Sequence, residues 1–260
     1  MKSGAFEVVC EIQPPTRPDL MAVRHQIGVL SKIASAFLVP DNHLGRATIS
    51  SVAVAHEVDL MGGRSIACLN ARDRNLLGFR RDLMTAAAYG VDEFLLVYGD
   101  RPVAGQRAGE LTVRSMLAEL RRFSEFAGPA GPLHLKAGVT TRLTPVAGWK
   151  EQADFLFVQA CFDLDALLRW RDATGFAGRV FAGVLVPPSA ARARKWATEI
   201  PEVSIPAWWV AALDADPAAG IRLACDLAAR IRDSGAFDGL HLIPGVKHRE
   251  VAFTLESTLA

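Results

Sequence analysis

Three polar side chains directly follow apolar, strand-like runs, and their types could carry chemistry. Glu11 closes the run FEVVCE, Asp100 closes EFLLVYGD and Gln159 closes DFLFVQ. In barrel-type α/β enzymes the loops after the strands form the active-site face, so these three residues would share one mouth. Two carboxylates and an amide placed there could combine proton transfer with hydrogen bonding to the edge of a small heterocycle.

Side-chain alternation in the first run predicts where Glu11 points. Val9 and Glu11 share one face of the strand, and the apolar residues between and beyond them share the other. The helix-covered side must be apolar, so Glu11 is expected to point into the barrel mouth. A carboxyl group partly removed from water favours its neutral form, which suits a general acid near neutral pH. A glutamate paired with an Arg or Lys at the rim is the equal alternative.

Strand-like and helix-like segments alternate along the whole chain, which indicates a parallel sheet with crossover helices. Eight such units favour a closed (β/α)8 TIM barrel, one domain over residues 1–260. An open doubly wound sheet is the alternative, but no G-x-G-x-x-G follows the first strand. The expected strands are Phe6–Ile12, Ala34–Val39, Arg64–Leu69, Glu93–Tyr98, Leu133–Ala137, Asp154–Gln159, Val180–Val186 and Gly239–Ile243. The expected helices are Asp19–Ser31, Ile49–Met61, Arg72–Tyr89, Glu110–Phe126, Leu164–Ala173, Ala190–Thr198 and Pro217–Ser234, while Thr144–Glu151 is short for a crossover helix.

Composition narrows the class of partner. The formal net charge is +1, which gives no global field to attract nucleic acid or an anionic membrane, so we expect a small-molecule substrate. The four cysteines form no C-x-x-C pair, and His56 and His134 have no spaced partners, so no metal site is expected. The N-terminus has no signal-peptide core, and no apolar run approaches a membrane span of about 18 residues, which indicates a cytoplasmic protein. A homo-oligomer is left open.

Five short motifs together resemble the methylenetetrahydrofolate reductase family. The segments CEIQPP, YGDRP, VQACFD, IPAW and GLHL are similar to the family's F-E-F-x-P-P, L-R-G-D-x-P, T-Q-x-x-F-D, I-P-A-W and G-x-H-F motifs. They occur in the family's order and span nearly the whole chain. Each is weak alone, and their combination is specific. The resemblance implies a (β/α)8 barrel that reduces 5,10-methylenetetrahydrofolate to 5-methyltetrahydrofolate, ordinarily through a bound flavin.

The resemblance also implies roles for single residues. Glu11 would be the acid that helps protonate N10 of the folate, which opens the five-membered ring to an N5 iminium. Asp100 would hydrogen-bond the pterin and stabilise the developing positive charge. Gln159 would hold the pterin edge. Lys247, after the last strand, could neutralise the glutamate tail of the folate, although basic residues at the start of a terminal helix are also common on surfaces.

Departures from the family pattern concern the flavin. Tyr98 replaces the arginine of L-R-G-D, Ser65 replaces the histidine of P-H-L-T-C, and the connection from Lys136 to Asp154 lacks the family's H-P-E-A segment and L-x-x-K helix. A flavin's phosphates and ribityl chain need paired donors, which are missing here. We therefore expect no bound FAD and direct hydride transfer from NADH or NADPH, similar to the flavin-free actinobacterial branch of the family.

The nicotinamide contacts expected from the sequence are Tyr98, Asn70 and Arg72. Arg72 begins the helix predicted after the third strand, and Asn70 is available as its N-cap, so this turn could bind phosphate. A solvated, capped helix start is at least as good an explanation. Three other functions stay open: an ordinary FAD-dependent reductase, a pterin-binding methyltransferase component without redox activity, and a noncatalytic folate-binding module.

Overall fold

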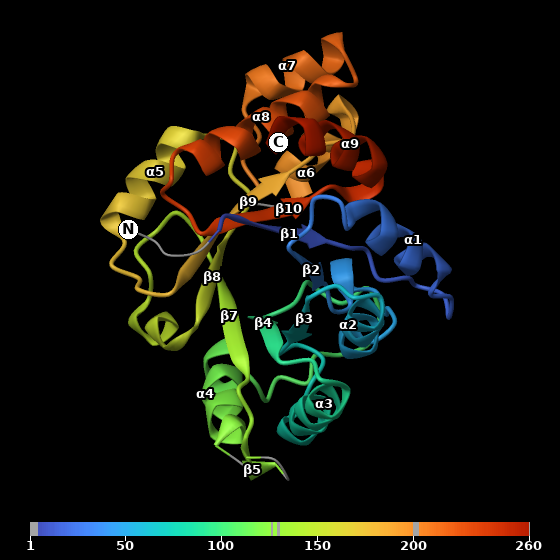
Figure 1. Ribbon diagram of the computed structural model, residues 1–260, viewed down its shortest axis with the longest axis vertical. Coiled ribbons are helices and arrows are strands. Elements are labelled where there is room, and N and C mark those ends of the chain that lie inside the picture. Colours follow the sequence, from blue (N-terminus) through green and yellow to red (C-terminus); the bar gives the residue numbers. More distant parts are fainter. Residues whose placement is uncertain (1–4, 126, 129–130, 200–202, 260) are drawn as a thin grey trace.

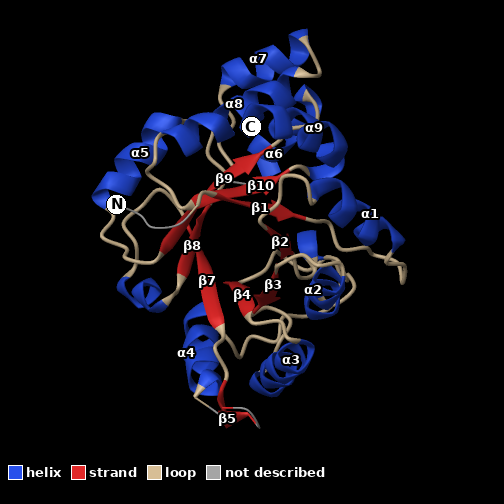
Figure 2. Cartoon of the chain, in the orientation of Figure 1, coloured by secondary structure: helices blue, strands red, loops and turns tan. Residues whose placement is uncertain are grey.

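Eight parallel strands close into a barrel, and helices surround it (Figures 1 and 2). The computed structural model describes residues 5–125, 127–128, 131–199 and 203–259, so Met1–Gly4 and Phe126, the last residue of a predicted helix, lie outside the described residues. Around the barrel the strand order is β1-β10-β9-β8-β7-β4-β3-β2, and β2 pairs with β1 to complete the ring. The strands are β1 Glu7–Glu11, β2 Ala36–Val39, β3 Ser65–Asn70, β4 Glu93–Val97, β7 Lys136–Thr141, β8 Phe155–Val158, β9 Arg179–Leu185 and β10 Gly239–Ile243. The predicted (β/α)8 TIM barrel is confirmed.

Helices cover the outside of the strands, and the region beside β9 and β10 carries the most of them (Figure 1). A two-stranded hairpin, β5 Ala127–Gly128 and β6 Gly131–Pro132, precedes β7. The α-helices are α1 Met21–Leu30, α2 Ser51–Leu60, α3 Leu76–Tyr89, α4 Val113–Ser124, α5 Leu164–Ala173, α6 Ala190–Glu199, α7 Ala207–Ala215, α8 Ala219–Asp233 and α9 His248–Leu259. The 3-10 turns are η1 His43–Gly45, η2 Gly148–Gln152 and η3 Gly245–Lys247.

Two separate hydrophobic clusters follow from the two faces of the barrel strands. The larger cluster fills the layer between strands and helices. The smaller one fills the barrel interior, where Phe157 stacks on Phe181 with ring centres 5.0 Å apart and Phe155 meets both edge-on. The interior below the mouth is therefore packed with side chains and is no pore. The interior cluster consists of Val9, Ala36, Leu38, Ile66, Cys68, Leu95, Phe155, Phe157 and Phe181.

Ion pairs close the end of the barrel formed by the starts of the strands. Glu7 pairs with Arg64 and with Arg179, the latter at 2.8 Å, and Glu93 pairs with Arg64 at 2.9 Å and with Lys136 at 3.1 Å. The Glu93 side chain is only 6 % exposed, so its charge needs these partners. This floor joins β1, β4, β7 and β9 at the end opposite the predicted site.

The fifth barrel strand lies later in the chain than the sequence predicts. We expected Leu133–Ala137, whereas β7 spans Lys136–Thr141. Gly138 explains the register: a Cβ there would lie 2.0 Å from the Phe155 ring, so this inward position accepts only glycine beside the packed phenylalanines. The Gly-Val-Thr-Thr stretch that looked like a loop is thus part of a central strand.

Two helix assignments also need correction. The helix predicted from Arg72 begins at Leu76, and its N-cap is Asn75, whose side chain accepts from the Gly78 amide at 2.8 Å; Asn70 is not the cap. The IPAW segment leads into α7, a helix that is absent from the predicted set, with Pro206 at its N-cap. The fixed φ of Pro206 suits the start of a helix.

A short connection joins β7 to β8. It contains only η2, as the short predicted segment indicated, so no α-helix covers this part of the barrel between α4 and α5. The connection is fixed by Lys150, whose ammonium donates to the Thr140 carbonyl oxygen at 2.8 Å. Among the described residues, no helix is long and apolar enough to cross a bilayer.

Candidate active site

Glu11 points into the barrel mouth, as the alternation of its strand predicts. Val9, two residues before it on the same face, belongs to the interior cluster. The Glu11 side chain is 13 % exposed and lies 3.2 Å from Nε2 of His241, measured from Oε2. His241 is the inward residue of β10 paired with Val9, and its ring meets Phe157 edge-on. The partner of Glu11 is therefore a histidine, and not the Arg or Lys of the alternative prediction.

His241 is the site residue that sequence reasoning did not single out. It occurs in the G-x-H-F-like motif, but no role was attached to it. Gly239, His241 and Ile243 alternate along β10, so strand parity alone could have placed the histidine inside the barrel beside Glu11. A polar residue in the middle of an otherwise apolar strand was the available signal.

Cys68 lies on the inward face of β3 close to Glu11. Burial, followed by the negative charges of Glu11 and Asp41, raises the pKa of the Cys68 thiol well above its usual value. The thiol is therefore neutral over the physiological range and does not compete with Glu11 for protons. Glu11 and His241 are left as the pair of proton-exchanging groups at this side of the mouth.

Asp41 and Asn70 join the exits of β2 and β3. The Asp41 carboxylate accepts from the Asn70 backbone amide at 3.0 Å and from the Asn70 side-chain amide at 2.6 Å, and it pairs with Arg74. Asn70 is fully buried, and its side-chain oxygen accepts from the Asp73 amide at 2.9 Å. The side chain of Asn70 is thus used within the protein, where it fixes the two loops.

Arg72 connects the exits of β3 and β4. Its guanidinium pairs with Asp73 and donates to the backbone carbonyl of Asp100, and only 2 % of the side chain is exposed. The hydrogen bond from Arg72 lowers the pKa of Asp73 to about 2. Arg72 therefore supports the loop that carries Asp100. A direct contact of Asn70 or Arg72 with a cofactor stays a prediction.

Asp100 stands on the exposed rim, where its carboxylate already has one partner. Its Oδ2 accepts from the Leu44 amide at 2.9 Å, and the Val103 amide donates to the Gly45 carbonyl at 2.9 Å. Asn42 and Leu44 both have positive φ, at 47° and 55°, which is uncommon outside glycine. The loops after β2 and β4 are thus bound to each other, and one carboxylate oxygen of Asp100 remains for a ligand.

The other predicted contacts lie on the same face of the barrel. The side-chain amide of Gln159 has no hydrogen-bond partner among the described residues, whereas its backbone amide donates to Thr141 at 2.9 Å. The Tyr98 ring is exposed, and the guanidinium of Arg107 lies over it, 5.6 Å from its centre. Lys247, in η3, pairs with Glu250 at 3.1 Å.

Glu11, Asp100 and Gln159 are spaced almost evenly around the rim of the barrel. Asp100 follows β4 and Gln159 follows β8, and each of these strands is three steps around the barrel from β1, which carries Glu11; β4 and β8 are two steps apart. A ligand that meets all three residues must therefore lie across the mouth. Large exposed apolar side chains from the connections after β2, β4 and β10 flank this opening; they are Leu44, Tyr98, Val103 and Val246.

Ser65 does not belong to this face. It is the first residue of β3, at the floor end of the barrel, and its hydroxyl hydrogen-bonds the Asp59 carboxylate. The exchange of a histidine for Ser65 therefore says nothing about a flavin in the mouth. The expectation of a flavin-free site rests on Tyr98 and on the short connection between β7 and β8.

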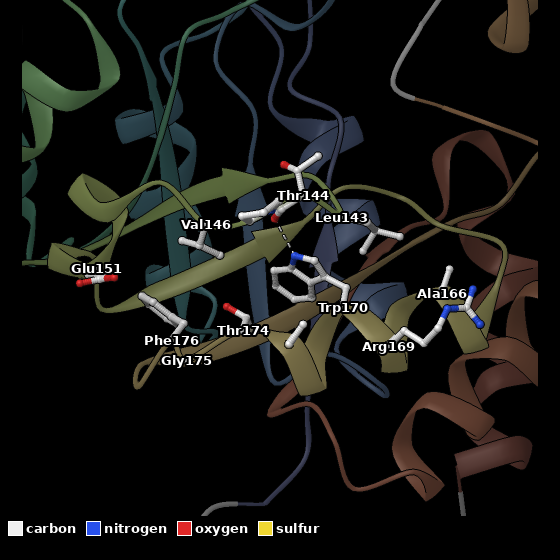
Figure 3. Close-up of a pocket in the computed structure, with 12 residues that line it drawn as sticks. Leu143, Thr144, Val146, Glu151, Ala166, Arg169, Trp170, Thr174, Gly175 and Phe176 are labelled. Carbon is white, nitrogen blue, oxygen red and sulfur yellow. Dashed lines mark hydrogen bonds between the residues drawn. The ribbon is translucent and has the colours of Figure 1, made fainter.

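A cavity of about 610 Å³ lies outside the barrel, between the start of the β7–β8 connection and α5 (Figure 3). Trp170 is at its centre, and the indole Nε1 donates to the Thr144 carbonyl at 2.9 Å. None of the predicted site residues lines it. The polar strand exits converge at the mouth instead, so we assign the candidate chemistry there. Among the described residues, no three of His, Cys, Asp and Glu are grouped to hold a metal ion.

Comparisons with solved structures agree with the fold. A Clostridium thermocellum protein that binds two copies of 5-methyl-5,6,7,8-tetrahydrofolic acid is 12% identical, with a TM-score of 0.67 over 98% of this chain and 96% of that one. The tryptophan synthase α-subunit of Pyrococcus furiosus is 11% identical, with a TM-score of 0.55 over 97% and 96% of the two chains. EDTA monooxygenase from Chelativorans sp. BNC1 is 10% identical, with a TM-score of 0.51 over 97% and 93%. No family model and no curated protein matches the sequence. At these identities the likeness shows the barrel fold alone.

Proposed function

We propose that this protein is a 5,10-methylenetetrahydrofolate reductase in which NADH or NADPH reduces the folate directly. The observation that carries the proposal is the inward-facing Glu11 together with Asp100 and Gln159, spaced around one barrel mouth. A pterin held between these residues would lie across the opening, as their spacing requires. The structural likeness to a protein that binds 5-methyltetrahydrofolate supports folate as the ligand.

Each of the three residues has one task in this proposal. Glu11 donates a proton to N10 of the folate, which opens the imidazolidine ring and leaves an iminium at N5. The free carboxylate oxygen of Asp100 accepts a hydrogen bond from the pterin and stabilises the positive charge as it develops. Gln159 can both donate to and accept from the heterocycle, because its side-chain amide has no partner among the described residues.

The rim offers groups that fit a nicotinamide cofactor. The exposed rings and aliphatic side chains around the mouth provide apolar surface for flat rings, and Arg101, next to Asp100, has no acidic partner among the described residues. An arginine in that position could bind a phosphate. The nicotinamide supplies the hydride when it is bound. Lys247, whose ion-pair partner among the described residues is the exposed Glu250, would exchange that partner for the glutamate tail of the folate.

FAD is not required in this proposal. Two features support its absence: Tyr98, with Arg107 over its ring, stands where the resemblance has an arginine, and the β7–β8 connection carries no α-helix. If hydride passes directly, both substrates must be in the mouth together, with donor and acceptor carbons about 3–3.5 Å apart. Ternary-complex formation gives sequential kinetics, whereas a flavin relay gives ping-pong kinetics.

The test is steady-state oxidation of NADH and of NADPH by flavin-stripped protein, with methylenetetrahydrofolate varied, with and without added FAD. We expect turnover without FAD, intersecting double-reciprocal lines and no visible absorption from the purified protein. Turnover only with FAD, on parallel lines, would return the chain to the ordinary flavoenzyme class. Tight folate binding without any NAD(P)H oxidation would instead favour the methyltransferase component or the noncatalytic folate-binding module.

A further inference from the structure

A histidine lies beside the Glu11 carboxyl group in the barrel mouth. Among the described residues, His241 is the sole side chain within ion-pair distance of it, with 3.2 Å between Oε2 and Nε2. Both side chains are nearly buried, with exposed fractions of 13 % for Glu11 and 11 % for His241. Water therefore solvates this pair poorly, so an uncompensated charge on either group would be costly.

The histidine is fixed in place by its surroundings. Its strand pairs with β1 on one side and β9 on the other, and its ring stands edge-on to Phe157, with centres 5.1 Å apart and planes at 88°. Nε2 is buried and forms no well-aligned hydrogen bond with the described residues, so the carboxylate is its nearest polar partner. A buried ring nitrogen without a hydrogen bond in a native structure calls for an explanation, and at 3.2 Å from the carboxyl oxygen it is close enough to exchange a proton after a small reorientation.

The other elements around the pair add few ionisable groups. β8 contributes the ring of Phe157, and β9 contributes Gly183 opposite His241. β3 contributes the Cys68 thiol, which burial keeps neutral. The loops after β2 and β3 contribute Asp41 and Arg74, which pair with each other. Glu7 and Arg179 lie on the same strands as Glu11 and Gly183 but at the floor, where they pair with each other at 2.8 Å.

We propose that His241 is a positioning residue that reloads Glu11 with a proton in each turnover. This role rests on the proposed function. After Glu11 has given its proton to N10, the neutral imidazole of His241 takes a proton from water at Nδ1 and transfers its Nε2 proton to the Glu11 carboxylate. One solvent proton is consumed per turnover, together with the hydride that reduces the iminium carbon, so the reaction balances. The electrons come from the nicotinamide, and His241 exchanges only protons.

The test compares His241→Asn and His241→Ala with wild type, and His56→Asn serves as the matched control. His56 is on α2, where its ring stacks on Tyr89, away from the mouth. We expect His241→Asn to lower kcat about 10- to 100-fold, in the range of one proton-transfer group, with folate Kd within about twofold of wild type. The dependence of kcat on pH should also change in this variant, because one of the two proton-exchanging groups has been removed. Added imidazole should restore part of the turnover of His241→Ala.

Two results would overturn the proposal. The first is a His241→Asn variant with wild-type kcat and an unchanged pH profile. The second is a loss of activity in His241→Ala that imidazole does not reverse, while folate Kd and thermal stability match those of His56→Asn. A merely structural histidine would change stability and folate affinity but would not respond to imidazole.

A measurement without turnover separates this proposal from the proposed function. In 15N-histidine NMR spectra, the ring signals of His241 should differ between Glu11→Gln and wild type, because the variant changes the group that lies 3.2 Å from Nε2, whereas the signals of His56 should stay the same. If this difference is seen in a wild-type protein that does not oxidise NADH or NADPH, the reductase assignment is wrong, while the coupling between Glu11 and His241 still holds. Identical His241 signals in both proteins would show that the two groups are not coupled, and the relay would be excluded whatever the activity.

Discussion

The backbone amide of Leu44 donates a hydrogen bond to Oδ2 of Asp100, at 2.9 Å, across 56 residues of sequence. The contact joins the loop after β2 to the loop after β4. It also orients the carboxylate, since one of its oxygens is held and the other is free. A ligand that approaches the free oxygen meets a carboxylate whose direction is already set, which lowers the entropic cost of binding.

Asp100→Asn is expected to weaken folate binding and turnover while the fold remains intact. The asparagine oxygen can still accept from Leu44, but the negative charge that would stabilise the iminium is lost. Gln159→Ala should likewise lower folate affinity, because it removes a side chain with no structural partner among the described residues. Isothermal titration with folate, together with kcat and KM, measures both effects. Unchanged Kd in both variants would contradict their placement on the pterin.

Glu11→Gln should keep folate binding and lower kcat by about 10²–10⁴-fold, because it removes the acid and preserves the shape. The amide has no proton to give to N10 and cannot be reloaded by His241. Stopped-flow measurements of NADH oxidation, with folate Kd measured separately, check this expectation. Wild-type kcat in this variant would remove Glu11 from the mechanism.

Gly45→Ala should lower folate affinity more than the same substitution at Gly90. Gly45 has φ of 71°, and a Cβ there would lie 2.0 Å from the carbonyl oxygen of Arg101, so the two rim loops would be pushed apart. Gly90→Ala is the matched control, since Gly90 has φ of 79° but no atom within 4 Å of the added carbon. Both variants should lose about 1 kcal/mol of stability from the backbone conformation, while only Gly45→Ala should lose folate affinity. Equal folate Kd in the two variants would argue against the role of the loop contact.

Asp73→Asn should destabilise the protein at neutral pH but not in acid. The hydrogen bond from Arg72 lowers the pKa of Asp73 to about 2, so the ionised carboxylate stabilises the fold above about pH 4. This stabilisation is lost as pH falls from about 4 towards 2, because the carboxylate then becomes protonated in the folded state as well. Allowing for solvent screening, we expect about 1–2 kcal/mol at pH 7 and a difference near zero at pH 2. Urea unfolding across this range measures it, and Asp233→Asn, on the exposed end of α8, should change little throughout.

Arg64→Met should lower stability and leave catalysis unchanged. Arg64 bridges Glu7 and Glu93, and without it the buried Glu93 keeps Lys136 as its one cationic partner in the described part of the chain. The expected loss is about 2 kcal/mol, less than for a fully buried pair because Arg64 itself is partly exposed. Arg81→Met, which removes an exposed arginine beside Asp82, is the control and should cost less than about 1 kcal/mol. The urea-unfolding midpoints and kcat values of both variants test whether the floor ion pairs affect stability without affecting catalysis at the mouth.

Local sequence patterns were enough to predict the elements whose structure depends mainly on neighbouring residues. The predicted strand Gly239–Ile243 and the predicted helix Leu164–Ala173 agree residue for residue with β10 and α5. The orientation of Glu11 also followed, because strand alternation needs no knowledge of distant contacts. The start of β7 could not be placed in this way, since its register depends on the Phe155 ring that occupies the space beside Gly138.

The hydrogen bonds of the site could not be predicted from the sequence. Asn70 looked like a helix cap because a helix follows it, whereas its actual partner, Asp41, lies 29 residues earlier and reaches it through the barrel register. Ser65 looked like a site residue because of its neighbours in the motif, but it occupies the first position of its strand, at the other end of the barrel. Pairings between separate loops depend on closure of the whole ring, which no single segment encodes.

The packed interior has a consequence for how such a protein could change over generations. Because Phe155, Phe157 and Phe181 fill the barrel below the mouth, bound molecules must lie above this aromatic layer and meet mainly the rim loops. Mutations in those loops can therefore alter which molecule is accepted without disturbing the packing that holds the strands together. Ligand preference can therefore drift through changes in the rim loops, while a different set of residues, in the interior, conserves the scaffold.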